Sequence, residues 1–247
     1  MSEIIGSYIE RIHELGSSNN YAATQLLTKR LTEGAVFVAD SQVGGRGQAS
    51  NKWESEPNKN LTFSILLYPE FLEIVRQFEI SKTISLGVVD YLKNLTDHVS
   101  IKWPNDIYIG KRKVSGILIE NSIRINKISS CIVGIGLNIN QQVFTSNAPN
   151  PVSLRQITGE IYDLEESLSD LCLKIDVRYH QLLNGQFRQI DDEYTEMLYQ
   201  RGCWSQYSDE NGDFEGQIIG VDQIGRLMVE TKAGKINKYH FKEVIFK

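Results

Sequence analysis

Apolar residues recur every three or four positions in four stretches of the chain, and this spacing predicts amphipathic helices. The predicted helices are 19–31, 78–95, 164–183 and 187–199, and a short helical turn is expected at 154–158. Short apolar or alternating runs bounded by turn residues predict strands. The predicted strands are 35–39, 61–68, 99–103, 107–109, 114–120 and 128–139. Asn19 or Asn20 suits the N-cap of the first helix, and Gly110 with Lys111 predicts a tight turn between two strands.

The pattern changes after Gly212. Short runs separated by turn residues follow one another at 214–221, 227–231, 235–240 and 244–246, as in a small all-β barrel or sheet of roughly 35 residues. A unit of that size buries little surface by itself, so we expect it to pack on the main domain. We therefore expect a main domain at 1–205 and a small β domain at 206–247.

Composition and charge exclude several classes of protein. The chain has 247 residues, of which 41% are hydrophobic and 23% are charged, as in ordinary globular proteins. Its net charge of −5 and the lack of a Lys/Arg-rich block argue against a nucleic-acid binder. No apolar run approaches the ~18 residues of a membrane-spanning helix. The three cysteines lack CxxC spacing, which favours a reducing cytoplasm over a disulfide framework or a zinc site.

A glycine-rich segment, GGRGQASNKW at 44–53, lies in a long loop between two predicted strands. Glycine allows backbone N–H groups to approach a phosphate or carboxylate closely, and Arg46 offers a planar fork of donors to the same oxygens. A connection of this length inside a compact domain is usually functional or disordered. The segment alone predicts a loop that covers an anionic ligand.

A second segment, KWPND at 102–106, joins a cation, an aromatic ring, a proline, an amide and an acid. Its proline favours extended backbone before it, so Asn105 and Asp106 are presented where a strand ends. If the turn at Gly110 brings the strands together, the ammonium of Lys113 returns beside Asp106. Each feature alone fits an ordinary turn or a solvated lysine, but an acid and a lysine at one pocket mouth suit magnesium-nucleotide and carboxylate chemistry.

Together with KVSGILIE at 113–120 and GIGLNIN at 134–140, these segments resemble the biotin protein ligase family. The C-terminal run EGQIIGVDQIGRLMVE resembles the family's small SH3-like domain. The resemblance implies an α+β fold, with a mixed-sheet catalytic domain of the biotin/lipoate ligase type and a small C-terminal SH3-like β-barrel. It also implies two reactions: the carboxylate of biotin attacks the α-phosphate of ATP, and a lysine of a biotin carboxyl carrier domain then attacks biotinyl-5'-AMP.

The resemblance assigns catalytic roles to Arg46, Lys113 and Asp106, the last as a candidate ligand of Mg²⁺. The implied biotin-binding residues are Ser17, Ser18, Asn19, Gln42, Gly45, Arg46, Lys113, Ser115, Gly116 and Leu118. The implied ATP- or adenylate-binding residues are Gly47, Gln48, Trp53, Asn105 and Asn138. Serine hydroxyls and a glutamine amide offer the donors and acceptors that a ureido ring needs. Three of these residues also have a structural alternative. Asn19 could equally cap a helix, Gly116 could be a glycine required only for packing, and Trp53 could anchor the end of the loop.

The glycine-rich segment departs from the family pattern at two positions. Many ligases of the family read GRGRxxR there, whereas this chain has Gln48 and Asn51 in place of the second and third arginines. Fewer cations above the adenylate predict weaker retention of the intermediate, although Gln48 can still donate a hydrogen bond to a phosphate.

Other functions remain as alternatives. A lipoate or octanoate ligase or transferase shares the fold, but Ser17, Ser18 and Gln42 favour a ureido ligand. A repressor with biotinyl-adenylate as corepressor, or a non-catalytic biotin-binding module, fits less well. Ser17 lies too close to the start of this sequence to follow a winged helix-turn-helix, so we expect a monofunctional ligase without the N-terminal DNA-binding domain. An exposed sheet edge is the expected surface for the carrier domain and for a homodimer.

Overall fold

The computed structural model describes residues 3–29, 31–48, 51–146 and 148–247. Arg30, in the first predicted helix, and Ala49 and Ser50, in the glycine-rich segment, lie outside the described residues. One mixed sheet has the strand order β1-β2-β3-β7-β6-β5-β4. Its strands are β1 (Ile9–Leu15), β2 (Val36–Gln42), β3 (Leu61–Leu67), β4 (Val99–Lys102), β5 (Asp106–Ile109), β6 (Arg112–Arg124) and β7 (Lys127–Leu137). β1 runs parallel to β2, whereas the other neighbours are antiparallel.

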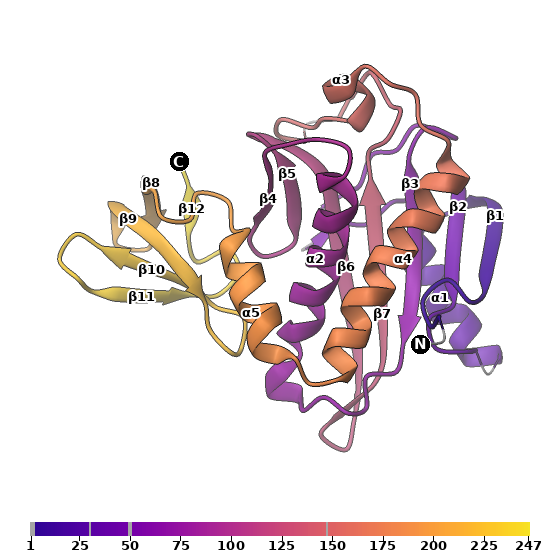
Figure 1. Cartoon of the computed structure of the whole chain (residues 1–247), viewed down its shortest axis with the longest axis horizontal. Coiled ribbons are helices and arrows are strands. Elements are labelled where there is room, and N and C mark those ends of the chain that lie inside the picture. Colours follow the sequence, from indigo (N-terminus) through magenta and orange to yellow (C-terminus); the bar gives the residue numbers. More distant parts are fainter. Residues whose placement is uncertain (1–2, 30, 49–50, 147) are drawn as a thin grey trace.

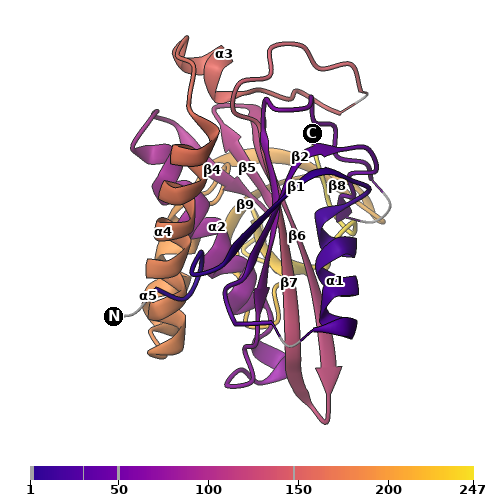
Figure 2. The same cartoon turned by 90° about the vertical axis from the view of Figure 1, so that its right-hand side faces the viewer.

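Helices cover both faces of this sheet. They are α1 (Ser18–Thr28), α2 (Phe78–Lys93), α3 (Leu154–Thr158), α4 (Leu164–Leu183) and α5 (Phe187–Glu196), with a 3-10 turn η2 (Ile74–Arg76) before α2. α2, α4 and α5 lie together on one face and α1 lies on the other (Figure 1, Figure 2). α2 approaches α4 closely because Gly87 has no side chain: a Cβ there would lie 2.8 Å from the Cα of Ile175.

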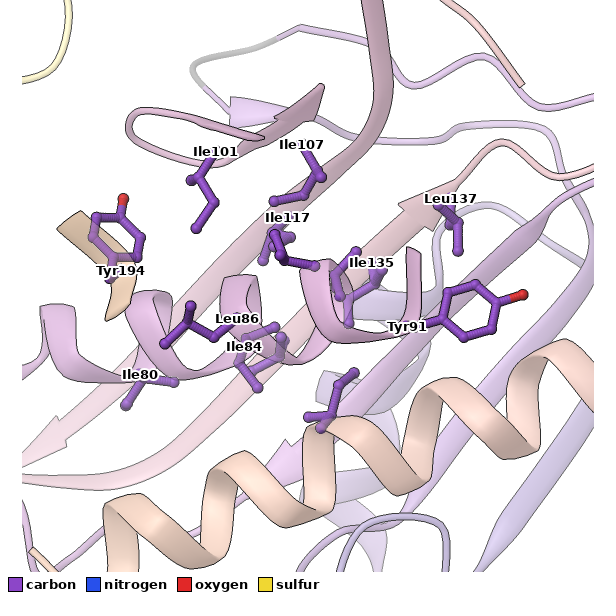
Figure 3. Packing of buried hydrophobic residues seen from close by; sticks show 14 of the residues in the cluster. Ile80, Ile84, Leu86, Tyr91, Ile101, Ile107, Ile117, Ile135, Leu137 and Tyr194 are labelled. Atoms are coloured by element: carbon purple, nitrogen blue, oxygen red, sulfur yellow. The ribbon is translucent and has the colours of Figure 1, made fainter. Parts of the chain in front are cut away.

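The main hydrophobic core lies between the sheet and the α2 face. Ile80 and Ile84 of α2 lie opposite Ile117 of β6 and Ile135 of β7 (Figure 3), and all four side chains are buried. The two α2 residues are four positions apart, so they share one face of the helix. On the other side of the sheet, a smaller cluster joins Phe37 to residues of α1.

A second, antiparallel sheet closes the C-terminal end of the chain, in the order β11-β10-β9-β8-β12. Its strands are β8 (Trp204–Asp209), β9 (Gly212–Val221), β10 (Leu227–Thr231), β11 (Ile236–Tyr239) and β12 (Ile245–Phe246). The indole Nε1 of Trp103 donates to the carbonyl of Gly225 at 2.9 Å and joins the two sheets. The predicted α+β fold with a small C-terminal β unit is confirmed. The boundary after residue 205 stays a prediction, and β8 begins at Trp204.

Most predicted elements are present close to their predicted ranges, and Gly110, with φ of 60°, makes the predicted turn between β5 and β6. Two strands, β1 and β8, were missed. The apolar residues of β1 are spaced three apart, at 9, 12 and 15, instead of alternating. The expected N-cap was also wrong: Ser17 precedes α1, and Asn19 lies inside its first turn. Among the residues described, no helix is both long and apolar enough to cross a lipid bilayer.

Candidate active site

A cavity of about 510 Å³ brings together most of the predicted site residues. Its walls come from the start of α1, the glycine-rich segment, the turn between β4 and β5, the first half of β6, the end of β7, and the end of the chain. The predicted residues that line it are Ser17, Ser18, Asn19, Gln42, Arg46, Gly47, Gln48, Trp53, Asn105, Asp106, Lys113, Gly116 and Leu118. This volume suits a small organic ligand.

The start of α1 offers hydrogen-bonding groups to the cavity. Ser17 and Ser18 are each 5% exposed, and the hydroxyl of Ser17 makes no capping bond to α1. The N–H of Ser18 donates to Oε1 of Gln42, at the end of β2, over 2.9 Å. This bond uses the amide oxygen of Gln42, so the NH₂ group of Gln42 remains as the hydrogen-bond donor for a ligand. Hydroxyls and an amide therefore stand together on one wall.

Asn19 connects α1 to the sheet and to the glycine-rich segment. Its Oδ1 accepts from the hydroxyl of Ser64 at 2.6 Å, and its Nδ2 donates to Oε2 of Glu120 at 2.8 Å. The same carboxylate oxygen forms an ion pair with Arg46. Both ends of the Asn19 amide are thus engaged by the protein, which indicates a positioning role. Glu120, which the sequence analysis did not single out, holds the arginine of the loop against β6.

The described parts of the glycine-rich segment, 44–48 and 51–53, pair with each other beside the sheet. The N–H of Gly47 donates to the carbonyl of Asn51 at 2.7 Å, and the N–H of Trp53 donates to that of Gly45 at 3.0 Å. A side chain at Gly45 would overlap the Trp53 carbonyl, so this position requires glycine. The backbone pairing sets the position of the Trp53 ring relative to the sheet.

Two glycines that are partners in adjacent strands form the floor under this ring. Gly116 of β6 pairs with Gly136 of β7. A Cβ on Gly116 would lie 3.0 Å from Cζ3 of Trp53, and a Cβ on Gly136 would overlap the indole. The buried Nε1 of Trp53 makes no hydrogen bond within the described part of the chain. This floor allows a flat group to lie directly on the backbone.

The predicted approach of Lys113 to Asp106 is confirmed. Nζ of Lys113 lies 2.7 Å from Oδ1 of Asp106, and both side chains are about a quarter exposed (25% and 23%). The same ammonium lies 5.6 Å from the ring centroid of Trp53. A cation thus stands beside the glycine floor and close to the indole, where it can meet an anionic ligand.

A β-bulge decides which way Lys113 points. The register of β5 and β6 shifts between Ile107 and Tyr108, which pair with Ser115 and Lys113 respectively, so Val114 is the extra residue. Regular alternation along β6 would put Lys113 and Gly116 on opposite faces of the sheet. The bulge moves Lys113 to the face of Gly116, and both line the cavity.

Lys102 is a further cation in the cavity, to which the sequence analysis gave no role. Its Nζ lies 5.1 Å from the ring centroids of Tyr108 and Phe246, and 3.3 Å from the Tyr108 hydroxyl. Burial lowers the pKa of Lys102, and Asp106 opposes this effect. The KWPND pattern could have pointed to Lys102. No local pattern could have placed Phe246 of β12 beside it.

Three predicted residues do not line this cavity. Ser115 is fully buried and its hydroxyl donates to the carbonyl of Gly136 at 2.7 Å. Asn138 donates through Nδ2 to the carbonyl of Val152 at 3.0 Å, and the N–H of Val152 donates to the carbonyl of Lys113 at 2.9 Å. Asn138 therefore supports the backbone of Lys113 from outside the cavity. Gly45 lines a neighbouring cavity.

The described residues do not fit a magnesium site held by the protein. Among the described residues that line the cavity, Asp106 alone is acidic, and its Oδ1 is paired with the ammonium of Lys113. Within the described ranges, no three His, Cys, Asp or Glu side chains gather as possible metal ligands. Mg²⁺ commonly binds through one or two carboxylates together with substrate phosphates. A magnesium ion here would have to be held chiefly by a nucleotide.

Comparison with known proteins agrees with this geometry. The bifunctional ligase/repressor BirA of Bacillus subtilis is 29% identical over 239 residues, which cover 94% of this chain and 72% of that protein. The biotin--[acetyl-CoA-carboxylase] ligase of Paracoccus denitrificans is 28% identical, covering 85% and 89%. The Aquifex aeolicus biotin protein ligase, solved with biotin and ATP, superposes with a TM-score of 0.81 at 27% identity over 98% of this chain and 99% of that one. Residues 12–138 match the biotin/lipoate A/B protein ligase family, and the chain belongs to that family.

Proposed function

We propose that this protein is an ATP-dependent biotin protein ligase. In the first reaction, a carboxylate oxygen of biotin attacks the α-phosphorus of ATP, forming an O–P bond and releasing pyrophosphate. In the second, the neutral amine of an acceptor lysine attacks the acyl carbon of biotinyl-5'-AMP. A C–N amide bond forms, the C–O bond to the phosphate breaks, AMP leaves, and the amine loses a proton to water.

One observation carries this proposal: the Lys113 ammonium, paired with Asp106 at 2.7 Å, stands beside the floor of Gly116 and Gly136 in a cavity that Arg46 also lines. Two anions must meet in the first reaction, and negative charge builds on the phosphate oxygens. Fixed cations offset that repulsion, and a cavity that orients both substrates removes much of the entropic cost of bringing them together.

The wall formed by Ser17, Ser18 and Gln42 favours biotin over a fatty acyl ligand. A ureido ring offers one carbonyl and two N–H groups, and hydroxyls with an amide can match them. A purely apolar acyl chain would leave these buried polar groups without partners, which costs free energy. The Bacillus and Paracoccus relatives carry ligase names, and the Aquifex structure holds biotin and ATP, which supports the same ligand here.

ATP and the adenylate are proposed to contact the glycine-rich segment and the turn between β4 and β5. The residues that would contact them are Gly47, Gln48, Trp53 and Asn105. Magnesium would arrive as MgATP, with the phosphates as its main ligands. Lys102, a cation whose pKa is lowered by burial, adds positive charge at the same wall.

The acceptor is proposed to be a biotin carboxyl carrier domain, in keeping with the name of the Paracoccus relative. Catalysis is assigned to 1–205, and residues 206–247 would close one side of the cavity. Homodimerisation through a sheet edge and a cytoplasmic location stay predictions.

The proposal is tested by incubating the protein with biotin, MgATP and a recombinant biotin carboxyl carrier domain, followed by mass spectrometry of the acceptor. We expect the mass of one biotinyl group on one lysine, and no modification without ATP. A thermal-shift comparison of biotin with lipoate, each with ATP, tests the ligand class. Stabilisation by lipoate alone, or a lipoyl mass on the acceptor, would replace biotin with lipoate in the proposal.

A further inference from the structure

A second, smaller cavity of about 230 Å³ adjoins the first at the edge of the main sheet. The two cavities share the lining residues Gln48, Pro104, Asn105, Ile117 and Leu118. β5 begins at Asp106, opposite Gly116, so the rest of β6 extends beyond the end of its neighbour. The smaller cavity lies along this extension, between β6 and the start of α2, and offers a route from the sheet edge to the proposed reaction centre.

Three buried oxygens that line this cavity make no hydrogen bond within the described ranges: Oε1 of Gln48, Oγ of Ser85 and Oδ1 of Asn121. Ser85, on α2, is 1% exposed. Nδ2 of Asn121 donates to Oε1 of Gln77 at 3.2 Å, which identifies the other end of the Asn121 amide as the oxygen that faces the cavity. Unpaired buried oxygens are uncommon and costly in folded proteins, so a cluster of three around one cavity indicates a missing donor.

The rest of the lining is apolar or neutral. Phe78, Ile119 and Ile224 contribute hydrocarbon walls, and none of the described lining residues is charged. A lysine side chain combines these properties: a four-carbon stem that packs on apolar surface and a terminal nitrogen with up to three N–H donors. Three acceptors around hydrocarbon walls therefore match one lysine better than a flat or anionic ligand.

We propose that this smaller cavity receives the acceptor lysine in the second reaction, and that Ser85 and Asn121 hold its nitrogen through their oxygens while Gln48 receives it where the cavities meet. The inference rests on the proposed function. Neutral acceptors suit the chemistry, because a carboxylate would favour the charged ammonium and raise its pKa, whereas attack requires the neutral amine.

The test separates the two reactions. Biotin-dependent exchange of pyrophosphate into ATP reports the first, and single-turnover transfer from preformed biotinyl-5'-AMP to a recombinant carrier domain reports the second. We expect Asn121→Leu and Ser85→Ala each to lower the transfer rate per unit of acceptor up to about tenfold, as loss of one hydrogen bond to the lysine nitrogen would. Exchange should stay within about twofold of the wild type, because neither side chain lines the larger cavity.

Two further variants distinguish lysine binding from a structural effect. Ser85→Thr keeps the hydroxyl and should restore transfer. Asn121→Asp should lower the acceptor concentration needed for half-maximal transfer and shift the pH profile of transfer to higher pH, since the carboxylate raises the amine's pKa. Ser122→Ala, next to Asn121 but exposed, is the matched control and should behave as wild type.

Transfer rates in Asn121→Leu and Ser85→Ala that equal the wild-type rate would overturn the inference and identify the cavity as a water site. An equal loss of exchange and transfer would also overturn it, because the residues would then act on the fold. A wild-type protein that shows no biotin-dependent exchange would instead contradict the proposed function.

Discussion

Replacing Lys113 with alanine should separate ligand binding from catalysis. The substitution removes the ammonium that lies 2.7 Å from Asp106, beside the floor of Gly116 and Gly136. Loss of one preorganised donor to a developing oxyanion typically costs about 3–4 kcal/mol of transition-state stabilisation, or roughly 10²–10³-fold in rate. We expect a decrease of this size in biotin-dependent pyrophosphate exchange.

The folded state should tolerate this change. Both side chains of the pair are about a quarter exposed, and ion pairs with such access to water contribute at most about 1 kcal/mol after solvent screening. For a chain of this length that corresponds to a shift of about 2–4 °C in Tm. Affinity for biotin, measured by calorimetry without ATP, should fall by less than about tenfold, because the serine and glutamine wall is unchanged.

Lys111→Ala is the matched control, since it removes the same charge from an exposed lysine in the same hairpin. Asp106→Asn keeps the ammonium of Lys113 and should lose less than about tenfold in exchange. The reasoning is refuted if Lys113→Ala retains exchange within about threefold of the wild type, or if Lys111→Ala loses as much activity as Lys113→Ala.

Three further predictions follow from other sites. Gln48→Arg adds a cation above the adenylate and should slow its escape in a single-turnover release assay; an unchanged release rate would show that charge at this position does not control retention. Gly136→Ala should lower the free energy of unfolding in urea by about 1–3 kcal/mol, because the new methyl overlaps Trp53, and Trp53→Ala should relieve the loss in the double variant. Burial raises the pKa of Glu79 above its usual 4.5 even though Lys82 opposes the shift, so the folded protein should lose stability as pH rises through the raised pKa. Glu79→Gln should remove that dependence. Urea unfolding of the variant and the wild type between pH 5 and 8 should therefore show the variant becoming more stable relative to the wild type as pH rises. A difference in stability that stays constant with pH would contradict the assignment.

Strong local patterns allowed much of the fold to be predicted. α4 was predicted at its observed bounds, and α2 within two residues, because long amphipathic helices repeat their apolar spacing over several turns. β1 was missed because its apolar spacing does not alternate. It lies at the edge of the sheet, and none of its residues is fully buried. Its conformation follows from parallel pairing with β2, a partner that local sequence does not specify.

The sequence by itself determined which chemical groups this protein carries, and the tight turn at Gly110 made the strands that bear Asp106 and Lys113 neighbours. The tertiary structure decided how those groups face one another. The bulge at Val114 turns Lys113 toward Gly116, and packing of the second sheet brings Phe246 to Lys102. Local periodicity reports how a segment buries its own side chains, whereas strand register and contacts between distant segments depend on packing across the whole chain.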